Sequence, residues 1–129
     1  MVKIDPQQEL FTKLKLAIES LGVKCFDNGL PPEDEKYPFT HLGEFQQIDD
    51  ANKTAVFGNV YGTINVWHKA KNRGDLSALL LKIKTVCREI EHTTNFSWFV
   101  VNINQRIITD STTNQPLLHA ILSVDWRFS

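Results

Sequence analysis

The stretch AVFGNVYGTINVWHK, from Ala55 to Lys69, decides the fold that this sequence predicts. Its even positions form a mostly apolar series, which comprises Val56, Gly58, Val60, Gly62, Ile64, Val66 and His68. Its odd positions form a more polar series, which comprises Phe57, Asn59, Tyr61, Thr63, Asn65, Trp67 and Lys69. Because successive side chains of a strand point to opposite faces, this period of two predicts one long β-strand with one buried face.

Amphipathic helices are predicted on both sides of this strand. Before it, Asp5 is suited to cap a helix that begins at Pro6, and apolar residues recur every three or four positions until Gly22 ends the pattern. After it, the turn KAKNRGD leads into a second helix that opens at Gly74-Asp75. Its predicted buried stripe consists of Leu76, Leu79, Leu80, Ile83, Val86, Cys87 and Ile90, with Cys87 as a buried reduced thiol.

Strand patterns also flank the long strand on its N-terminal side. A short strand is expected at 23–26, followed by a surface loop rich in proline and acidic residues. The segment 38–46, PFTHLGEFQ, is predicted as a strand that forms an antiparallel hairpin with the long strand through the polar turn QIDDANKT. Strict alternation predicts that one of its faces carries Phe39, His41, Gly43 and Phe45.

The C-terminal third contains the remaining strands. FSWFVVNI at 96–103 is rich in aromatic and β-branched residues and is predicted as a strand, with a turn at Asn104-Gln105 and a short strand at 106–109. The segment LLHAILSVDWRFS alternates consistently, which predicts a final strand that is central in the sheet or well covered.

This order of elements predicts a single α+β domain spanning residues 1–129. We expect a mainly antiparallel β-sheet with two amphipathic helices packed on one face. The opposite face is expected to be half-polar, with Tyr61, Thr63, Trp67, His119 and Asp125.

Composition narrows the classes of function. A chain of 129 residues with 42% hydrophobic and 22% charged residues is typical of one soluble globular domain. A formal net charge of −1 argues against general affinity for nucleic acids or membrane surfaces, which need a concentrated basic field. The sequence shows no apolar signal core and no membrane-spanning run, so we expect an intracellular protein, at least where it is made.

Motifs for catalysis or cofactor binding are missing from the sequence. The six glycines form neither a Rossmann nor a P-loop pattern. The four histidines are scattered singly and lack metal-ligand spacing, so neither a metal nor another cofactor is expected. We interpret His68 and His119 as ordinary sheet-surface residues and expect no enzymatic activity; an enzyme of unrecognised type remains an alternative.

One basic cluster is the basis of a second alternative. His68, Lys69, Lys71 and Arg73 follow the long strand and form either a solvated turn or a contact for an acidic partner. With Trp67 beside them to stack on a base, the same residues are compatible with a small nucleic-acid-binding α+β module.

The order of several segments resembles the tail completion family of long-tailed bacteriophages, whose members are also described as tail terminator or head-to-tail joining proteins. The segments that carry this resemblance are LFTKLKLAIESLG, YPFTHLGE, a strand ending in VW, GDLSALLLKIKTVCREI, RIITD and ILSVDWRFS. Together they cover nearly the whole chain.

The resemblance implies a structural phage or prophage protein. Such proteins assemble as a ring, usually a hexamer, on the head-proximal end of the tail tube, where they stop tube polymerisation and dock to the head connector. The implied partners are other copies of the chain, the tail tube protein and a head-completion or connector protein, while DNA only passes through the ring. The implied location is the virion, after synthesis in the host bacterial cytoplasm, without cofactor or turnover. Another neck or head-completion protein is a neighbouring alternative.

Charge and loop position suggest which residues contact partners. The polar loops 46–54 and 110–116 are expected at one end of the subunit, where they meet a partner ring. We expect Asp49-Asp50 to face the lumen and repel DNA, and the turn 69–73 to form a protein contact. The candidate contact residues are Asp49, Asp50, Asn52, Lys53, Lys69, Lys71, Arg73, Asp110, Thr112 and Asn114.

Overall fold

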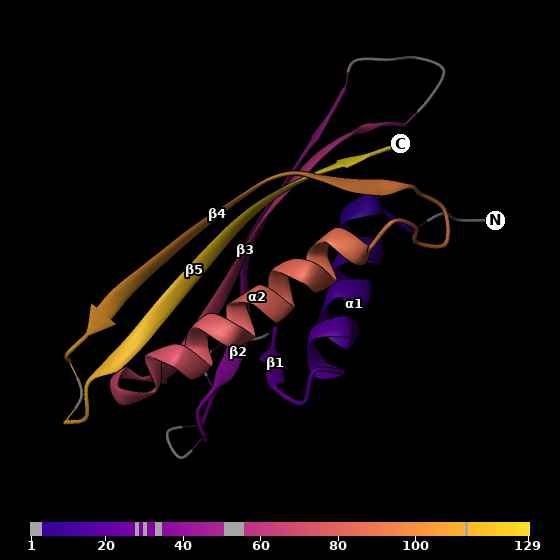
Figure 1. Ribbon diagram of the computed structural model, residues 1–129. Coiled ribbons are helices and arrows are strands. Elements are labelled where there is room, and N and C mark those ends of the chain that lie inside the picture. Colours follow the sequence, from indigo (N-terminus) through magenta and orange to yellow (C-terminus); the bar gives the residue numbers. More distant parts are fainter. Residues whose placement is uncertain (1–3, 28, 30, 33–34, 51–55, 113) are drawn as a thin grey trace.

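A five-stranded sheet with two α-helices on one of its faces forms the structure (Figure 1). The computed structural model describes residues 4–27, 29, 31–32, 35–50, 56–112 and 114–129. In chain order the elements are α1 (Pro6–Glu19), β1 (Lys24–Phe26), β2 (Phe39–Asp49), β3 (Gly58–Lys69), the 3₁₀-helix η1 (Ala70–Asn72), α2 (Arg73–Glu89), β4 (Trp98–Asp110) and β5 (Leu117–Phe128).

The strands lie in the order β1-β2-β3-β5-β4. Only β1 and β2 pair in parallel, and the other three neighbouring pairs are antiparallel. The predicted α+β class with a mainly antiparallel sheet is therefore confirmed. Strand β5 lies between β3 and β4, which confirms that the alternating C-terminal segment is an interior strand.

Both helices begin and pack where the apolar pattern predicts. The Asp5 carboxylate accepts a hydrogen bond of 3.2 Å from the backbone N–H of Gln7, and Pro6 is the first residue of α1. Helix α2 begins at Arg73, next to the predicted start. The stripes of the two helices meet the sheet through side chains that are fully buried, namely Leu10, Leu14, Ile18, Leu76, Leu80, Ile83 and Cys87.

The apolar series of the two interior strands forms the floor of this core. Val60, Ile64 and Val66 of β3 are 0% exposed, as the period of two predicts. At Gly62 the rings of Phe45 and Trp126 lie over the backbone, and a Cβ atom there would approach Trp126 Cζ3 to 2.9 Å. The glycine therefore lets two large aromatic side chains pack over the centre of the sheet.

Cysteine burial follows the prediction. Cys87 is 0% exposed, and both Cys87 and Cys25 are free thiols. Burial disfavours the thiolate and raises the pKa of Cys87 to about 12.

A β-bulge in β2 makes part of the predicted face assignment wrong. The register with β3 shifts between Leu42 and Phe45. Before the shift, Phe39 lies opposite Trp67 on the face away from the helices. After it, Phe45 lies on the helix face, with its ring 5.2 Å from that of Phe11. The extra residue of the bulge reverses the alternation, so Phe39 and Phe45 do not share a face.

The predicted turn at Asn104-Gln105 is also wrong. Strand β4 runs without interruption from Trp98 to Asp110, with Asn104 opposite Ser123 and Gln105 opposite Leu122. The long partner β5 supplies cross-strand contacts along this whole length, and at the edge of a sheet polar side chains reach water without leaving the strand. A second bulge, between Val100 and Asn102, lies in this strand.

Candidate functional site

The face of the sheet turned away from the helices, called the open face here, carries the candidate functional site. No helix lies over this face in Figure 1. As predicted, this face is half-polar: Tyr61 is exposed, and Thr63, Trp67, His119 and Asp125 are half-buried. The side chains of the open face lie outside the core, and the strands hold them in fixed positions relative to one another.

Stacked rings occupy one end of the open face. Tyr37 stacks on Phe39 with ring centroids 5.5 Å apart, Phe39 on Trp67 at 5.3 Å, and Trp67 on His119 at 4.2 Å. Since Phe39, Trp67 and His119 are cross-strand neighbours on β2, β3 and β5, the Trp67 ring lies between the other two. Rings therefore stack on both faces of Trp67, and the four stacked side chains form one continuous surface.

Hydrogen bonds orient the last ring of this row. His119 Nε2 lies 2.8 Å from Asn65 Oδ1, and Asn65 Nδ2 donates to the carbonyl of His41 at 3.5 Å. With the amide in this orientation, Nε2 of His119 carries the proton that it donates. Burial lowers the pKa of His119, which favours the neutral imidazole that lies parallel to Trp67.

A polar hollow occupies the middle of the open face. It has a volume of about 420 Å³, and its lining includes Glu44, Gln46, Asn102, Asn104, Ser123 and Asp125. Among the residues that the structure describes, two carboxylates line it and no lysine or arginine does. The hollow therefore offers hydrogen-bond acceptors to a partner that brings donors or a positive charge.

An arginine cluster lies beyond the hollow, at the β2–β3 hairpin. Arg127 donates two hydrogen bonds to the Asp50 carboxylate, at 3.2 and 2.7 Å, and one to Asn59 Oδ1 at 2.7 Å. Asn59 in turn donates to Asp125 at 2.7 Å, and the Arg127 guanidinium lies 5.3 Å from the centre of the Phe57 ring. The hydrogen bonds to Asp50 raise the pKa of Arg127. This cluster fixes the open face at the hairpin end.

The carboxylate of Asp50, which was expected to repel DNA, is therefore paired with the guanidinium of Arg127. Its neighbour Asp49 ends β2, is exposed, and accepts a hydrogen bond of 2.8 Å from the Gln47 side chain. Asn52 and Lys53, which were predicted as contact residues in the same loop, lie outside the described residues.

The remaining predicted contact residues come together at the other end of the sheet. Lys69 and Asp110 lie opposite the same residue, Leu117, from its two sides. Asp110 accepts hydrogen bonds from the backbone and hydroxyl of Thr112, which lower the pKa of its carboxyl group. Exposed side chains of the same end are Lys71, Arg73, Thr112 and Asn114.

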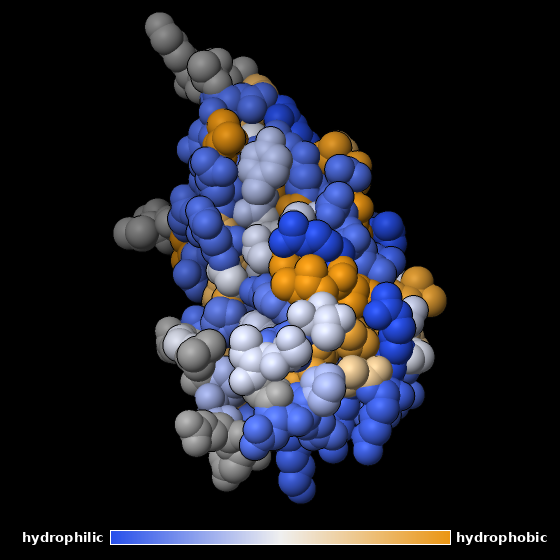
Figure 2. All heavy atoms as spheres, turned by 90° about the vertical axis from the view of Figure 1, so that its left-hand side faces the viewer, coloured by the Kyte–Doolittle hydropathy of each residue, from blue (hydrophilic) through white to orange (hydrophobic). Residues whose placement is uncertain are grey.

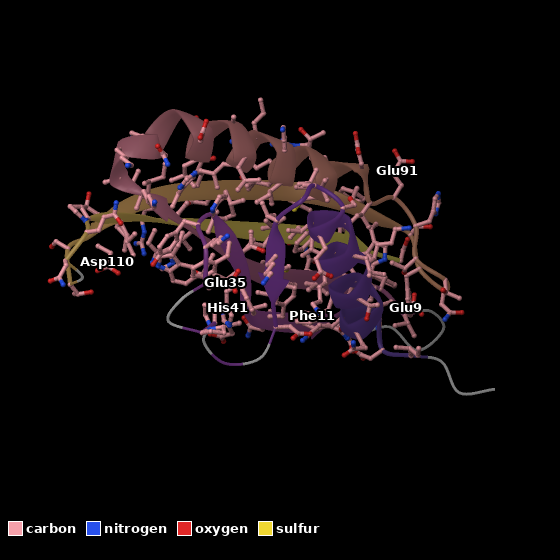
Figure 3. The ribbon with its side chains drawn as sticks, turned by 90° about the horizontal axis from the view of Figure 1, so that it is seen from below. Glu9, Phe11, Glu35, His41, Glu91 and Asp110 are labelled. Atoms are coloured by element: carbon pink, nitrogen blue, oxygen red, sulfur yellow. The ribbon has the colours of Figure 1, made fainter. Side chains whose placement is uncertain are left out.

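The predicted placement of loops 46–54 and 110–116 at one end is consequently wrong. One loop precedes β3 and the other precedes β5, and these strands are antiparallel neighbours, so the two loops lie at opposite ends. Figure 3 shows Asp110 at one extremity of the sheet, with Glu91 and Glu9 towards the other.

His68 corrects another expectation. It was interpreted as a sheet-surface residue, yet it lies on the helix side and is 5% exposed. The backbone N–H of Lys69 donates to His68 Nδ1 at 2.8 Å, and burial lowers the pKa of this histidine. The surface basic cluster therefore consists of Lys69, Lys71 and Arg73 alone.

Within the described ranges, the structure holds no group of three His, Cys, Asp or Glu side chains that could bind a metal ion. In the same residues, no helix has both the length and the apolar character that crossing a membrane requires.

An exposed edge strand is the feature that the sequence did not reveal. Strand β4 ends the sheet, and Phe99, Val101 and Ile108 along it are 60%, 53% and 43% exposed. Seen from the β4 side, hydrophobic residues gather in a patch bordered by hydrophilic ones (Figure 2). The sequence shows only that this strand is rich in apolar residues. Such a pattern does not distinguish an edge strand from a buried one, so the exposure of these residues could not be predicted.

Comparison with solved structures shows a similarity in fold. The fold matches a chain of the virion of a native gene transfer agent particle, with a TM-score of 0.62 and 12% sequence identity, over 95% of this chain and 94% of that one. The likeness shows that the two chains share a fold from end to end. No protein-family model matches the sequence, and no curated protein does.

Proposed function

We propose that this chain is a structural component of a phage-like particle, and specifically a tail terminator. In this role it forms a ring on the head-proximal end of the tail tube, stops addition of tube subunits and docks to the head connector. It acts by assembly and not by turnover, and DNA passes through the ring.

The full-length fold similarity to a chain of a virion carries this proposal. The order of sequence segments that resembles the tail completion family supports the more specific role. The structure adds surfaces that suit assembly: an open face with ordered side chains, two polar ends, and an uncovered edge strand. These are the features of a subunit that contacts several neighbours at once.

The nucleic-acid-binding alternative loses its main support. Trp67 was the residue expected to stack on a base, but Phe39 and His119 already stack on its two faces. His68 is buried and does not contribute to a basic surface. Only three cations remain in the turn, too few for a strong electrostatic footprint.

Removal of the gene from a particle-producing host tests the proposal. A tail terminator is expected to leave filled heads without tails and tail tubes of uncontrolled length, which electron microscopy of the lysate would show. Purified protein added back to growing tubes should stop their elongation and bind at one end only. Normal tube length together with empty or unstable heads would instead indicate a head-completion protein.

A further inference from the structure

The sheet has two free edges on opposite sides. Strand β4 is one edge over its whole length. Strand β2 is the other edge beyond His41, because β1 pairs only with Phe39, Thr40 and His41. Within the part of the chain that the structure describes, neither free stretch has a strand partner on its outer side.

The register identifies the residues of β4 whose backbone groups point outward. Ser97 and Ser129 exchange two backbone hydrogen bonds, at 2.9 and 3.1 Å, so the odd-numbered residues of β5 direct their backbone groups to β4. Residues of β4 opposite the even-numbered residues of β5 therefore direct their N–H and C=O groups away from the sheet. These residues are Ile103, Gln105, Ile107 and Thr109.

Strand β4 has few features that protect this edge: its bulge lies near its start, between Val100 and Asn102, and Arg106 is the one charged residue in its middle. Natural proteins block long edge strands with lysine, proline or a covering element. Strand β4 has 13 residues, WFVVNINQRIITD, without lysine or proline, and exposes the large apolar residues Phe99, Val101 and Ile108. An edge of this length and character is an aggregation hazard for a free subunit but an ordinary feature of one whose edge pairs in an assembly.

The free edge of β2 is complementary to that of β4 in charge and in apolar character. The stretch of β2 that lacks an outer strand partner, residues 44–49 with the sequence EFQQID, carries Glu44 and Asp49 and no cation. Its Ile48 is 50% exposed. Strand β4 brings exposed apolar residues and the cation Arg106 in its exposed middle. Pairing the two edges would place opposite charges and apolar side chains next to each other.

We propose that the outer edge of β4 in one copy pairs with the free stretch of β2 in the next copy, so that the sheet continues from subunit to subunit. Because two different surfaces meet, the contact is head-to-tail and closes into a ring when the rotation permits. This inference rests on the proposed function, which requires a ring, and it assigns the subunit interface.

Gln105→Pro tests the pairing without disturbing the fold. Gln105 is exposed and directs its N–H outward, so proline there removes a donor from the free edge and leaves the β4–β5 hydrogen bonds intact. Gln105→Thr is the matched control, since it changes the same side chain but keeps the N–H and the strand propensity. Both variants are compared with the wild type by circular dichroism and by sedimentation from low micromolar to near millimolar concentration.

We expect the wild type and Gln105→Thr to form a discrete species larger than a dimer, such as one of six times the 14.8 kDa chain mass. We expect Gln105→Pro to stay folded and monomeric, with self-association weakened by more than about tenfold. A labelled Gln105→Pro chain keeps an intact β2 edge, so it should co-sediment with wild-type copies.

Three results would overturn the inference. Assembly of Gln105→Pro equal to that of the wild type would place the interface elsewhere and leave the proposed ring intact. A monomeric Gln105→Pro that does not bind the wild type would indicate a symmetric β4–β4 dimer. A wild type that remains monomeric near millimolar concentration would exclude the pairing in solution, while tube capping would still decide the proposed function.

Discussion

The two faces of one sheet differ in what their side chains do. On the helix face Val60, Ile64 and Val66 are fully buried, and they contribute to folding by losing contact with water. On the open face the side chains of the same strand remain partly accessible and make contacts of other kinds. Trp67 stacks between two rings, Thr63 lines the polar hollow and Asn59 belongs to the arginine cluster. The comparison indicates that stability comes mainly from one face, and that the other is available for binding.

Neighbouring residues of β3 give the sharpest test of this division. Ile64→Ala should lower the free energy of unfolding by about 3–4 kcal/mol, because it leaves a cavity under the helices. Thr63→Ala, one residue away on the open face, should lower it by less than about 1 kcal/mol. Urea unfolding of both variants measures the difference. Equal losses would show that the open face is part of the folding core.

A smaller loss of stability is expected at Gly62, where the packing on the helix face requires a residue without a side chain. Gly62→Ala should cost about 1–3 kcal/mol, because the new Cβ would press on the rings of Phe45 and Trp126. Gly74→Ala is the matched control: a Cβ at this exposed position of α2 meets nothing within 4 Å, so the change should be neutral or stabilising. Thermal unfolding separates the two, and a harmless Gly62→Ala would contradict the tight packing.

Alkaline pH should weaken the helix face through Cys87. Its pKa rises from 9.0 to about 12 on folding, so the unfolded chain loses its proton first. The stability linked to Cys87 is therefore complete below pH 9 and is lost as the pH rises towards 12. Each pH unit in this window should reduce the free energy of unfolding by up to about 1.4 kcal/mol more in the wild type than in Cys87→Ala. Parallel pH curves for the two proteins would contradict this burial effect.

The alternation of β3 and β5 was sufficient to predict the helix face. Two adjacent interior strands with a strict period of two leave little choice for which side the helices cover. The same reasoning was wrong for Phe45, because a bulge inserts a residue without a local sequence signature. A turn was also predicted at Asn104-Gln105 from the polar character of these residues. They are instead part of the edge strand β4, where polar side chains reach water.

The open face was harder to predict because its contacts join distant parts of the chain. Arg127 and Asp50 are 77 residues apart, and nothing in either segment indicates their pairing. His119 was expected at the surface, but its stacking on Trp67 depends on a register that only the folded sheet defines. Loop charges were visible in the sequence, whereas the end of the sheet at which each loop lies was not.

The smallest effect on stability, together with a large effect on assembly, is expected in the polar hollow. Ser123 is exposed on the open face and lines the hollow between acceptor side chains. Ser123→Arg fills the hollow without entering the core, so the free energy of unfolding should change by no more than about 0.5 kcal/mol. Ser123→Ala is the control, because it removes the hydroxyl but leaves the hollow open.

If the open face binds a partner ring, Ser123→Arg should still self-associate like the wild type but fail to join tails to heads, while Ser123→Ala joins them normally. Complementation of a deletion host, scored by the yield of tailed particles, measures this. Normal joining by Ser123→Arg would assign the partner contacts to the two ends of the sheet and leave the open face without a role in docking. Loss of joining with unchanged folding would separate the two faces by function as clearly as burial separates them by structure.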